Sequence, residues 1–367
     1  MGCLKPFKET LKNYLDELSR LYLSGLISFS PYIPVIKKLI HEIFEHLGEI
    51  SGKGERKIEI ESLEAGSITD SRLPVVRVWD GTARIHFYIE LIHPNTQNID
   101  IQSDLMAQQY TGMYLSFVYT NFFCFFSCYD KHINSNPLMS FHATNIDELN
   151  RHKEDVIKDE AILLKLFKCF LNYDSPYLKF YGEFLQALIM KVSFLREHLM
   201  IQEIKKNLFS ESNAKKAYSH YLNYLEGNFK ITDLSSLLSH NIADGFLTAW
   251  IYRKYQQIRQ KEKEVKPFCR KNITEYLVYA DDIHSNRYAL FEYLSSEEIS
   301  ETIRWMLDDI ASLFMLNQPE EMIFWPSGSG METELKRVRE DFVQGYYSND
   351  KIPGHFIKIL KREGLYL

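Results

Sequence analysis

The chain has 367 residues, of which 45% are hydrophobic and 25% charged, a balance that excludes wholesale disorder and a fibrous fold and leaves room for two domains. Its formal net charge is −6, so contact with nucleic acid requires a local basic patch, because the field of the whole chain repels phosphate. The five cysteines are scattered and no segment reads as a signal peptide or membrane span, which favours a reduced chain in the cytoplasm.

The first part of the chain reads as two helices followed by strands. Apolar residues at helical spacing predict helices over 11–22 and 31–44, and the period then changes to two, which predicts a strand over 58–63. Segments 73–79 and 82–92 predict a hairpin around a two-residue Asp80-Gly81 loop. That loop would pair Val75 with His86 and place both on one sheet face with Glu90 and Ile92.

A helix over 99–114 and two strands over 115–121 and 122–129 complete the predicted α/β module. From about residue 145 the pattern is one helix after another, over 154–171, 177–208, 214–225, 231–258 and 296–314. The sequence therefore predicts a module of residues 1–144 with a mixed sheet flanked by helices, followed by an all-α module of residues 145–367.

Several motifs follow these elements in a consistent order. The first module carries Arg72-Leu73-Pro74-Val75, Tyr88-Ile89-Glu90-Leu91-Ile92, Gln109-Tyr110 and Val118-Tyr119-Thr120-Asn121; the second carries Ile242-Ala243-Asp244-Gly245-Phe246, Phe268-Cys269-Arg270-Lys271-Asn272 and Ile303-Arg304-Trp305-Met306-Leu307-Asp308-Asp309. Together they resemble the nuclease and connector region of single-chain type ISP and type IIG restriction-modification enzymes. The resemblance implies a fold class of α+β or α/β: a restriction-endonuclease-like PD-(D/E)xK domain and a helical connector domain.

The chain departs from that family at two of the three catalytic positions. PD-(D/E)xK chemistry uses two acids to hold a divalent metal and a lysine to orient the attacking water. Val75 stands at the position of the first acid and Ile92 at that of the lysine, so that only Glu90 remains, as a vestigial catalytic residue. One carboxylate does not hold a catalytic metal, which needs several oxygen ligands. The resemblance therefore implies a catalytically degenerate module that binds DNA or a separately encoded methyltransferase, with no certain cofactor.

Two other functions remain open at this point. The first is an active, Mg²⁺-dependent endonuclease with relocated ligands, in which Asp80 would join Glu90 as a weak metal ligand, although Asp80 also has a sufficient role as a turn residue. The relocated groups would come from Asp70, Glu59 and Glu61, with Arg84 or His86 in place of the lysine. The second is a purely structural interaction protein whose aromatic surface docks another protein.

Two segments are candidates for partner binding. Arg253, Lys254, Arg259 and Lys261 begin a densely charged stretch that we expect to contact DNA phosphates weakly and without sequence preference, together with Gln109; its alternative is a solvated helix end. Segment 345–367 gathers aromatic and aliphatic residues where the family continues into its methyltransferase. It predicts a docking surface for that enzyme or for a second copy of the chain, with folding back onto its own domain as the alternative.

Overall fold

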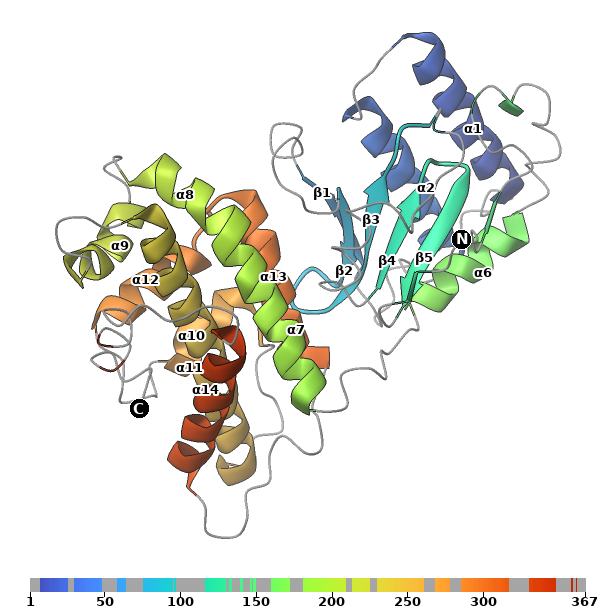
Figure 1. The fold of residues 1–367 in the computed structure, drawn as a ribbon. Coiled ribbons are helices and arrows are strands. Elements are labelled where there is room, and N and C mark those ends of the chain that lie inside the picture. The colour runs from blue at the N-terminus through green and yellow to red at the C-terminus, as the bar shows by residue number, and fades with distance from the viewer. Residues whose placement is uncertain are drawn as a thin grey trace. The chain divides into compact units, whose positions relative to one another are not determined.

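A computed structural model of the chain describes residues 7–25, 30–47, 58–63, 75–94, 96, 116–129, 132–133, 139–140, 146, 148–149, 160–171, 181–208, 213–224, 230–260, 268–277, 285–316, 330–347, 358 and 361. The chain divides into two compact units, Met1–Pro176 and Tyr177–Leu367 (Figure 1). The division lies later than the expected one at residues 144 and 145, and the reason is a helix, α6 (Glu160–Leu171), which packs into the first unit.

The first unit is built on a mixed sheet. Its elements are α1 (Phe7–Leu23), the short 3₁₀ turn η1 (Ser30–Tyr32), α2 (Ile33–His46), β1 (Glu59–Ser62), β2 (Val76–Trp79), β3 (Ile85–Leu91), β4 (Ser116–Thr120), β5 (Cys124–Tyr129), β6 (His132–Ile133), β7 (Met139–Ser140) and α6. The strand order is β1-β2-β3-β4-β5-β6, with β7 also paired to β5; β3 and β4 run parallel and all other pairs antiparallel. The predicted mixed sheet flanked by helices is confirmed.

One face of this sheet forms the core of the unit with α1, α2 and α6. Alternate residues of β3, namely Phe87, Ile89 and Leu91, join the hydrophobic cluster, as the period of two in the sequence predicted. Phe167 of α6 lies at the centre of an aromatic group, with its ring centroid 5.8 Å from that of Phe87. Burial of these rings against the sheet is what holds α6 in the first unit.

The second unit is all-helical, as predicted. Its elements are α7 (Tyr181–Phe194), the π-helical turn η4 (Leu195–Leu199), α8 (Met200–Asn207), α9 (Asn213–Tyr224), α10 (Ile231–Gln260), the 3₁₀ turn η5 (Arg270–Asn272), α11 (Ile273–Leu277), α12 (Ser285–Ser295), α13 (Glu301–Leu316) and α14 (Met331–Tyr346). The predicted helix over 177–208 is one run, α7 to α8, that passes through the π turn. Helices α11, α12 and α14 are additional to the sequence prediction.

Helix α10 is the centre of the second unit. From Leu234 to Lys254 every side chain except Ser236 and Tyr252 is buried, and α7, α8, α9, α11 and α14 pack around it. A helix that is buried on all sides has no single apolar stripe and owes its stability to its neighbours. No helix in the described ranges has both the length and the apolar character needed to cross a membrane.

Candidate active site and nucleic-acid interface

The hairpin of β2 and β3 pairs in a different register from the predicted one. Its paired positions are Val76 with Ile89, Arg77 with Tyr88, Val78 with Phe87 and, after a bulge, Trp79 with Ile85. The ladder ends at the pair of Val76 and Ile89, so Val75 and Glu90 are the next positions beyond its end on the two sides of the hairpin. The prediction that Val75 faces His86 is wrong, because the connection spans residues 80–84 and is not a two-residue loop.

Asp80 organises this connection. Its Oδ1 atom accepts hydrogen bonds from the backbone N–H groups of Thr82, Ala83 and Arg84 at 2.8, 2.8 and 3.0 Å, and its own N–H donates to the carbonyl of Arg84 at 2.9 Å. Gly81 has a φ of +78°, and a Cβ atom there would lie 2.7 Å from the side-chain Cδ of Glu59. Asp80 therefore has the turn role that its Asp-Gly context indicated, with one carboxylate oxygen committed to the backbone.

Glu90 lies on β3, an inner strand of the sheet. The other two positions of the catalytic motif carry the aliphatic residues Val75 and Ile92. Glu90 pairs with Tyr119 of β4 and is partly exposed. Val75 is 5% exposed and belongs to the hydrophobic core, while Ile92 is partly exposed and donates its backbone N–H to the carbonyl of Thr120. Neither aliphatic side chain offers the oxygen ligand or the ammonium group that the reaction needs.

The other candidate ligands within the described residues do not gather into a metal site. Glu61 forms an ion pair with Arg77 at 2.7 Å, and Arg77 is buried with its guanidinium carbon 4.0 Å from the centroid of the Trp79 ring. His86 is also buried. No group of three His, Cys, Asp or Glu side chains suited to a metal occurs in the described ranges, and Asp70 lies outside them.

The Thr120-Asn121 motif forms the turn between β4 and β5. Phe122 has a φ of 76°, an uncommon conformation for a residue with a Cβ. The Thr120 hydroxyl accepts a hydrogen bond from the Phe122 N–H at 2.9 Å. The side-chain Oδ1 of Asn121 accepts hydrogen bonds from the backbone N–H groups of Phe123 and Cys124 at 3.1 and 2.8 Å. Tyr14 of α1 donates its hydroxyl to the Phe122 carbonyl at 3.0 Å. These polar side chains therefore hold a buried turn.

The charged residues of the helical motifs form buried ion pairs. The carboxylate of Asp244 in α10 accepts hydrogen bonds from Nε and Nη2 of Arg339, at 2.6 and 3.0 Å, in a bidentate pair. Asp308 pairs with Arg270 at 3.2 Å, and Asp309 pairs with Lys191. The sequence alone gave no sign of these partners, which lie 38 or more residues apart. Their charges tie α10, α13 and α14 to the rest of the unit.

The predicted cationic stretch begins inside this same unit. Arg253 and Lys254 are 6% and 7% exposed. Arg253 donates to the Met315 sulfur at 3.7 Å and lies 6.0 Å from the centroid of the Phe268 ring. These two residues therefore belong to the interior and do not form part of an exposed cationic surface. The side chain of Arg259, together with Lys261 and Gln109, lies outside the described residues.

Lys254 gives a testable consequence of this burial. Loss of hydration and the neighbouring Arg253 charge lower its pKa to about 8, from 10.5, and the described residues include no ion-pair partner for it. Between about pH 8 and 10.5 the unfolded chain binds more protons at this site than the folded chain, so stability rises with pH across that window. Lys254→Met is expected to raise the melting temperature at pH 7 and to flatten this rise; Lys230→Met, an exposed control, leaves both unchanged. A lower melting temperature for Lys254→Met would contradict the prediction.

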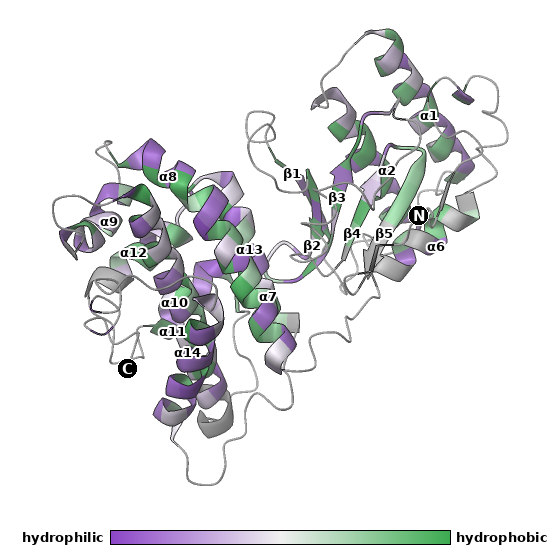
Figure 2. Cartoon of the chain, viewed as in Figure 1, coloured by the Kyte–Doolittle hydropathy of each residue, from purple (hydrophilic) through white to green (hydrophobic). Residues whose placement is uncertain are grey.

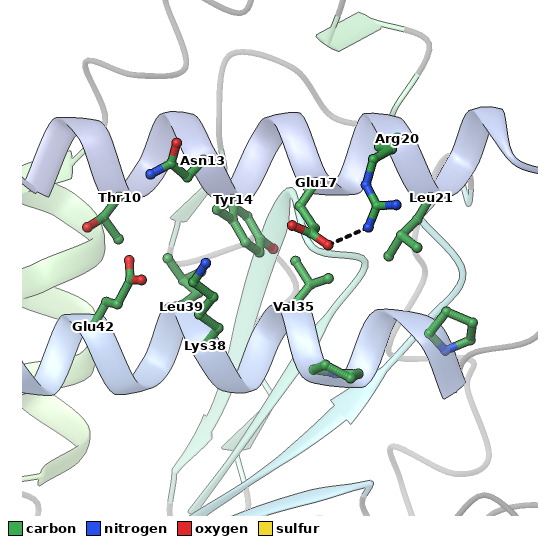
Figure 3. Close-up of a pocket in the computed structure, with 12 residues that line it drawn as sticks. Thr10, Asn13, Tyr14, Glu17, Arg20, Leu21, Val35, Lys38, Leu39 and Glu42 are labelled. Atoms are coloured by element: carbon green, nitrogen blue, oxygen red, sulfur yellow. Dashed lines mark hydrogen bonds and ion pairs between the residues drawn. The ribbon is translucent and has the colours of Figure 1, made fainter.

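A groove of about 370 Å³ lies between α1 and α2 (Figure 3). The groove is lined by charges of both signs. On α1, Glu17 and Arg20 form an ion pair at 2.7 Å, and on α2 the groove is lined by Lys38 and Glu42. Balanced charge has no net attraction for phosphate, and the groove contains none of the residues predicted to act in catalysis or DNA binding. It therefore adds no support to either function.

Neither a family model nor a curated protein matches the sequence. Among solved structures, one described as "cryoEM structure DrdV-DNA complex" aligns with 93% of this chain at 10% identity and a TM-score of 0.31. The chain spans 29% of the length of the aligned chain in that complex. A TM-score of this size does not establish a common fold, and the bound DNA is a property of that complex.

Proposed function

We propose that this chain is the N-terminal part of a restriction-modification-type enzyme, in which a nuclease-like domain has lost its catalytic metal site and the chain binds DNA. The observation that carries the proposal is the hairpin register. The ladder ends at Val76 and Ile89, so positions 75 and 90 are the next ones beyond this end of the hairpin, and the chain has a buried valine of the hydrophobic core at position 75.

The surroundings of Glu90 support loss of the metal site over its relocation. Among the described candidate acids, Asp80 is committed to its own turn and Glu61 is paired with Arg77. A carboxylate that is already hydrogen-bonded or paired with arginine must give up that partner before it can bind a metal. The described part of the chain nevertheless contains a mixed sheet, the β4–β5 turn and buried ion pairs, and in our proposal it binds DNA through a surface separate from the lost metal site.

DNA is the partner that we favour over a separately encoded methyltransferase or a second copy of the chain. Tyr346 and Tyr347, the described aromatic residues of the predicted docking segment, are buried in their own unit. Tyr347 stacks on His240 and its hydroxyl lies 3.2 Å from Nδ1 of that ring. These two residues are therefore part of the core of the second unit, while the stretch Phe356 to Leu360, whose folding back was the alternative, lies outside the described residues except for Lys358. Of residues 348–367, the described positions are Lys358 and Lys361 alone.

The proposal predicts DNA binding without cleavage. Purified chain incubated with supercoiled plasmid and Mg²⁺ or Mn²⁺ is expected to leave the plasmid intact, while fluorescence anisotropy detects binding to a labelled duplex at 50 mM salt. Nicking that depends on metal and disappears in Glu90→Ala would establish the active endonuclease with relocated ligands instead. Absence of binding at 50 mM salt would remove DNA as the partner.

A gain-of-function variant tests the assignment of the lost positions. Val75→Asp combined with Ile92→Lys restores the acid and the lysine, and metal binding is the more direct readout because it precedes catalysis. We expect the double variant to bind Mn²⁺ more tightly than the wild type by isothermal titration calorimetry, and Glu90→Ala added to it to abolish the gain. An equal gain without Glu90 would show that these positions do not form one site.

A further inference from the structure

Exposed cations in the described structure are commonly paired with acids. Arg20 pairs with Glu17, and Arg337 with Glu334. Lys271 and Arg304 both pair with Glu297, at 3.1 and 2.5 Å. Such pairs are neutral from a distance and offer little attraction to a polyanion.

Helices α8 and α9 have the opposite arrangement. Lys205 and Lys206 lie in the last turn of α8, and Lys215 and Lys216 lie in the first turn of α9. All four are exposed, and none of them forms an ion pair with a residue in the described part of the chain. We call these four residues the α8–α9 lysines. Figure 2 colours much of both helices as hydrophilic.

The one acid of α8 points inward. Glu203 is 3% exposed, accepts a hydrogen bond from the Tyr293 hydroxyl at 2.5 Å and accepts another from the Asn207 side chain at 2.9 Å. Helix α9 contains no acidic residue. Helices α8 and α9 therefore expose lysines and no carboxylate. This makes them locally cationic in a chain whose formal net charge is −6.

Chain geometry keeps the four lysines near one another. The two helices are joined by residues 209–212, which span at most roughly 18 Å between Leu208 and Asn213 when fully extended. Both helices pack on α10, and α9 also packs on α12, so that their ends are held by the core of one unit. Duplex DNA carries one phosphate charge for about every 1.7 Å of its axis. A lysine surface that extends up to roughly 18 Å along the axis would therefore lie next to several phosphates.

We infer that the α8–α9 lysines are the surface through which this chain contacts the phosphate backbone of duplex DNA. The inference rests on the proposed DNA binding and assigns it to a place in the second unit. These lysines take the place of Arg253 and Lys254, which are buried, because they are exposed and have no ion-pair partner among the described residues. Contacts of this kind position a protein on DNA without reading its sequence.

Two acids near these helices refine the expectation. Glu211 lies in the connection between them. Glu298, between α12 and α13, lies beside the first residue of α9, and its Oε1 accepts a hydrogen bond from the Asn213 side chain at 2.7 Å. A carboxylate beside a phosphate-binding surface opposes binding. Glu298→Gln keeps an oxygen acceptor for Asn213 and removes the charge, so we expect it to tighten DNA binding.

The experiment measures the salt dependence of duplex binding by anisotropy. Four phosphate contacts give a slope of about −3.6 in log K against log salt, or a loss of roughly 10²-fold between 50 and 200 mM. Changing all four α8–α9 lysines to Gln is expected to remove most of this slope. The matched control changes four other exposed lysines to Gln, Lys8, Lys12, Lys230 and Lys336, and alters the net charge by the same amount. The control should keep the slope, and both variants should melt at the wild-type temperature because all eight side chains are exposed.

The outcomes separate the two proposals. If the wild type binds duplex and the α8–α9 variant keeps its slope, the surface is elsewhere while DNA binding stands. If both quadruple variants lose the slope equally, net charge alone accounts for binding and the assignment to α8 and α9 fails. If the wild type does not bind at 50 mM salt, the proposed function fails and this inference with it.

Discussion

Arg270→Met is expected to lower the free energy of unfolding of the helical unit by about 3–5 kcal/mol, because it leaves a buried charge without its partner. Arg270 is 2% exposed, and its Nε donates to Asp308 at 3.2 Å. A second nitrogen donates to the backbone carbonyls of Leu294 and Ser296 at 2.8 and 3.2 Å. Methionine fills much of the space and supplies none of these bonds. Urea denaturation followed by circular dichroism measures the loss.

The next residue is the matched control. Lys271 pairs with Glu297 at 3.1 Å, but the two side chains are 65% and 62% exposed. Lys271→Met is expected to cost about 0–1 kcal/mol, as exposed pairs do. Adding Asp308→Leu to Arg270→Met should recover much of the loss, because it removes the orphaned carboxylate. Equal losses for Arg270→Met and Lys271→Met would show that burial of the pair is not what stabilises this part of the fold.

The elements of this chain were predictable because helix and strand periods are local. The alternation in β3 and the helical spacing of apolar residues in α1 and α2 appear within a few residues and do not depend on distant partners. Hairpin register is less local. It depended on how Asp80 distributes its hydrogen bonds among Thr82, Ala83 and Arg84, and the Asp-Gly pair suggested a shorter loop.

The candidate DNA surface was harder to predict, because charge in a sequence carries no information about burial. Arg253 and Lys254 lie in the richest run of cations, yet Met315, from α13, packs on Arg253. Lys205 and Lys206 are fewer and less conspicuous, and they became informative only when Glu203 beside them was found to be buried against Tyr293. Contacts between residues far apart in the sequence decide which cations reach solvent.

The domain boundary shows the same limit. The last described strand, β7, ends at Ser140, and the next of the helices described above, α6, begins at Glu160. Helix α6 nevertheless belongs to the same unit as the sheet, because Phe167 packs among Phe44, Phe87 and Phe125. The type of secondary structure does not determine the unit in which an element buries its apolar face. Likewise, the Asp residues of the helical motifs drew attention as candidate functional groups, and their partners Arg270, Arg339 and Lys191 give them structural roles.

Gly245→Ala is expected to destabilise the helical unit, although alanine is the better helix former. Gly245 lies within α10, and a Cβ atom there would lie 2.0 Å from Cζ and 2.4 Å from Cε2 of Phe291. Phe291 lies in α12 and is fully buried, so its ring must shift within a packed core to make room for the added Cβ. Overpacking of this kind costs about 1–3 kcal/mol, occasionally more. It exceeds the gain of about 1 kcal/mol in helix propensity.

Two further variants separate the steric effect from the backbone effect. Gly182, in the first turn of α7, has open space around its missing Cβ, so Gly182→Ala is expected to stabilise the unit by about 0.5–1 kcal/mol. Phe291→Leu shortens the opposing side chain, and combined with Gly245→Ala it should lose less stability than the sum of the two single changes. The urea midpoints of the wild type, Gly245→Ala, Phe291→Leu and the double variant measure this coupling. Wild-type stability for Gly245→Ala would mean that α10 and α12 are not held at the close approach that this glycine permits.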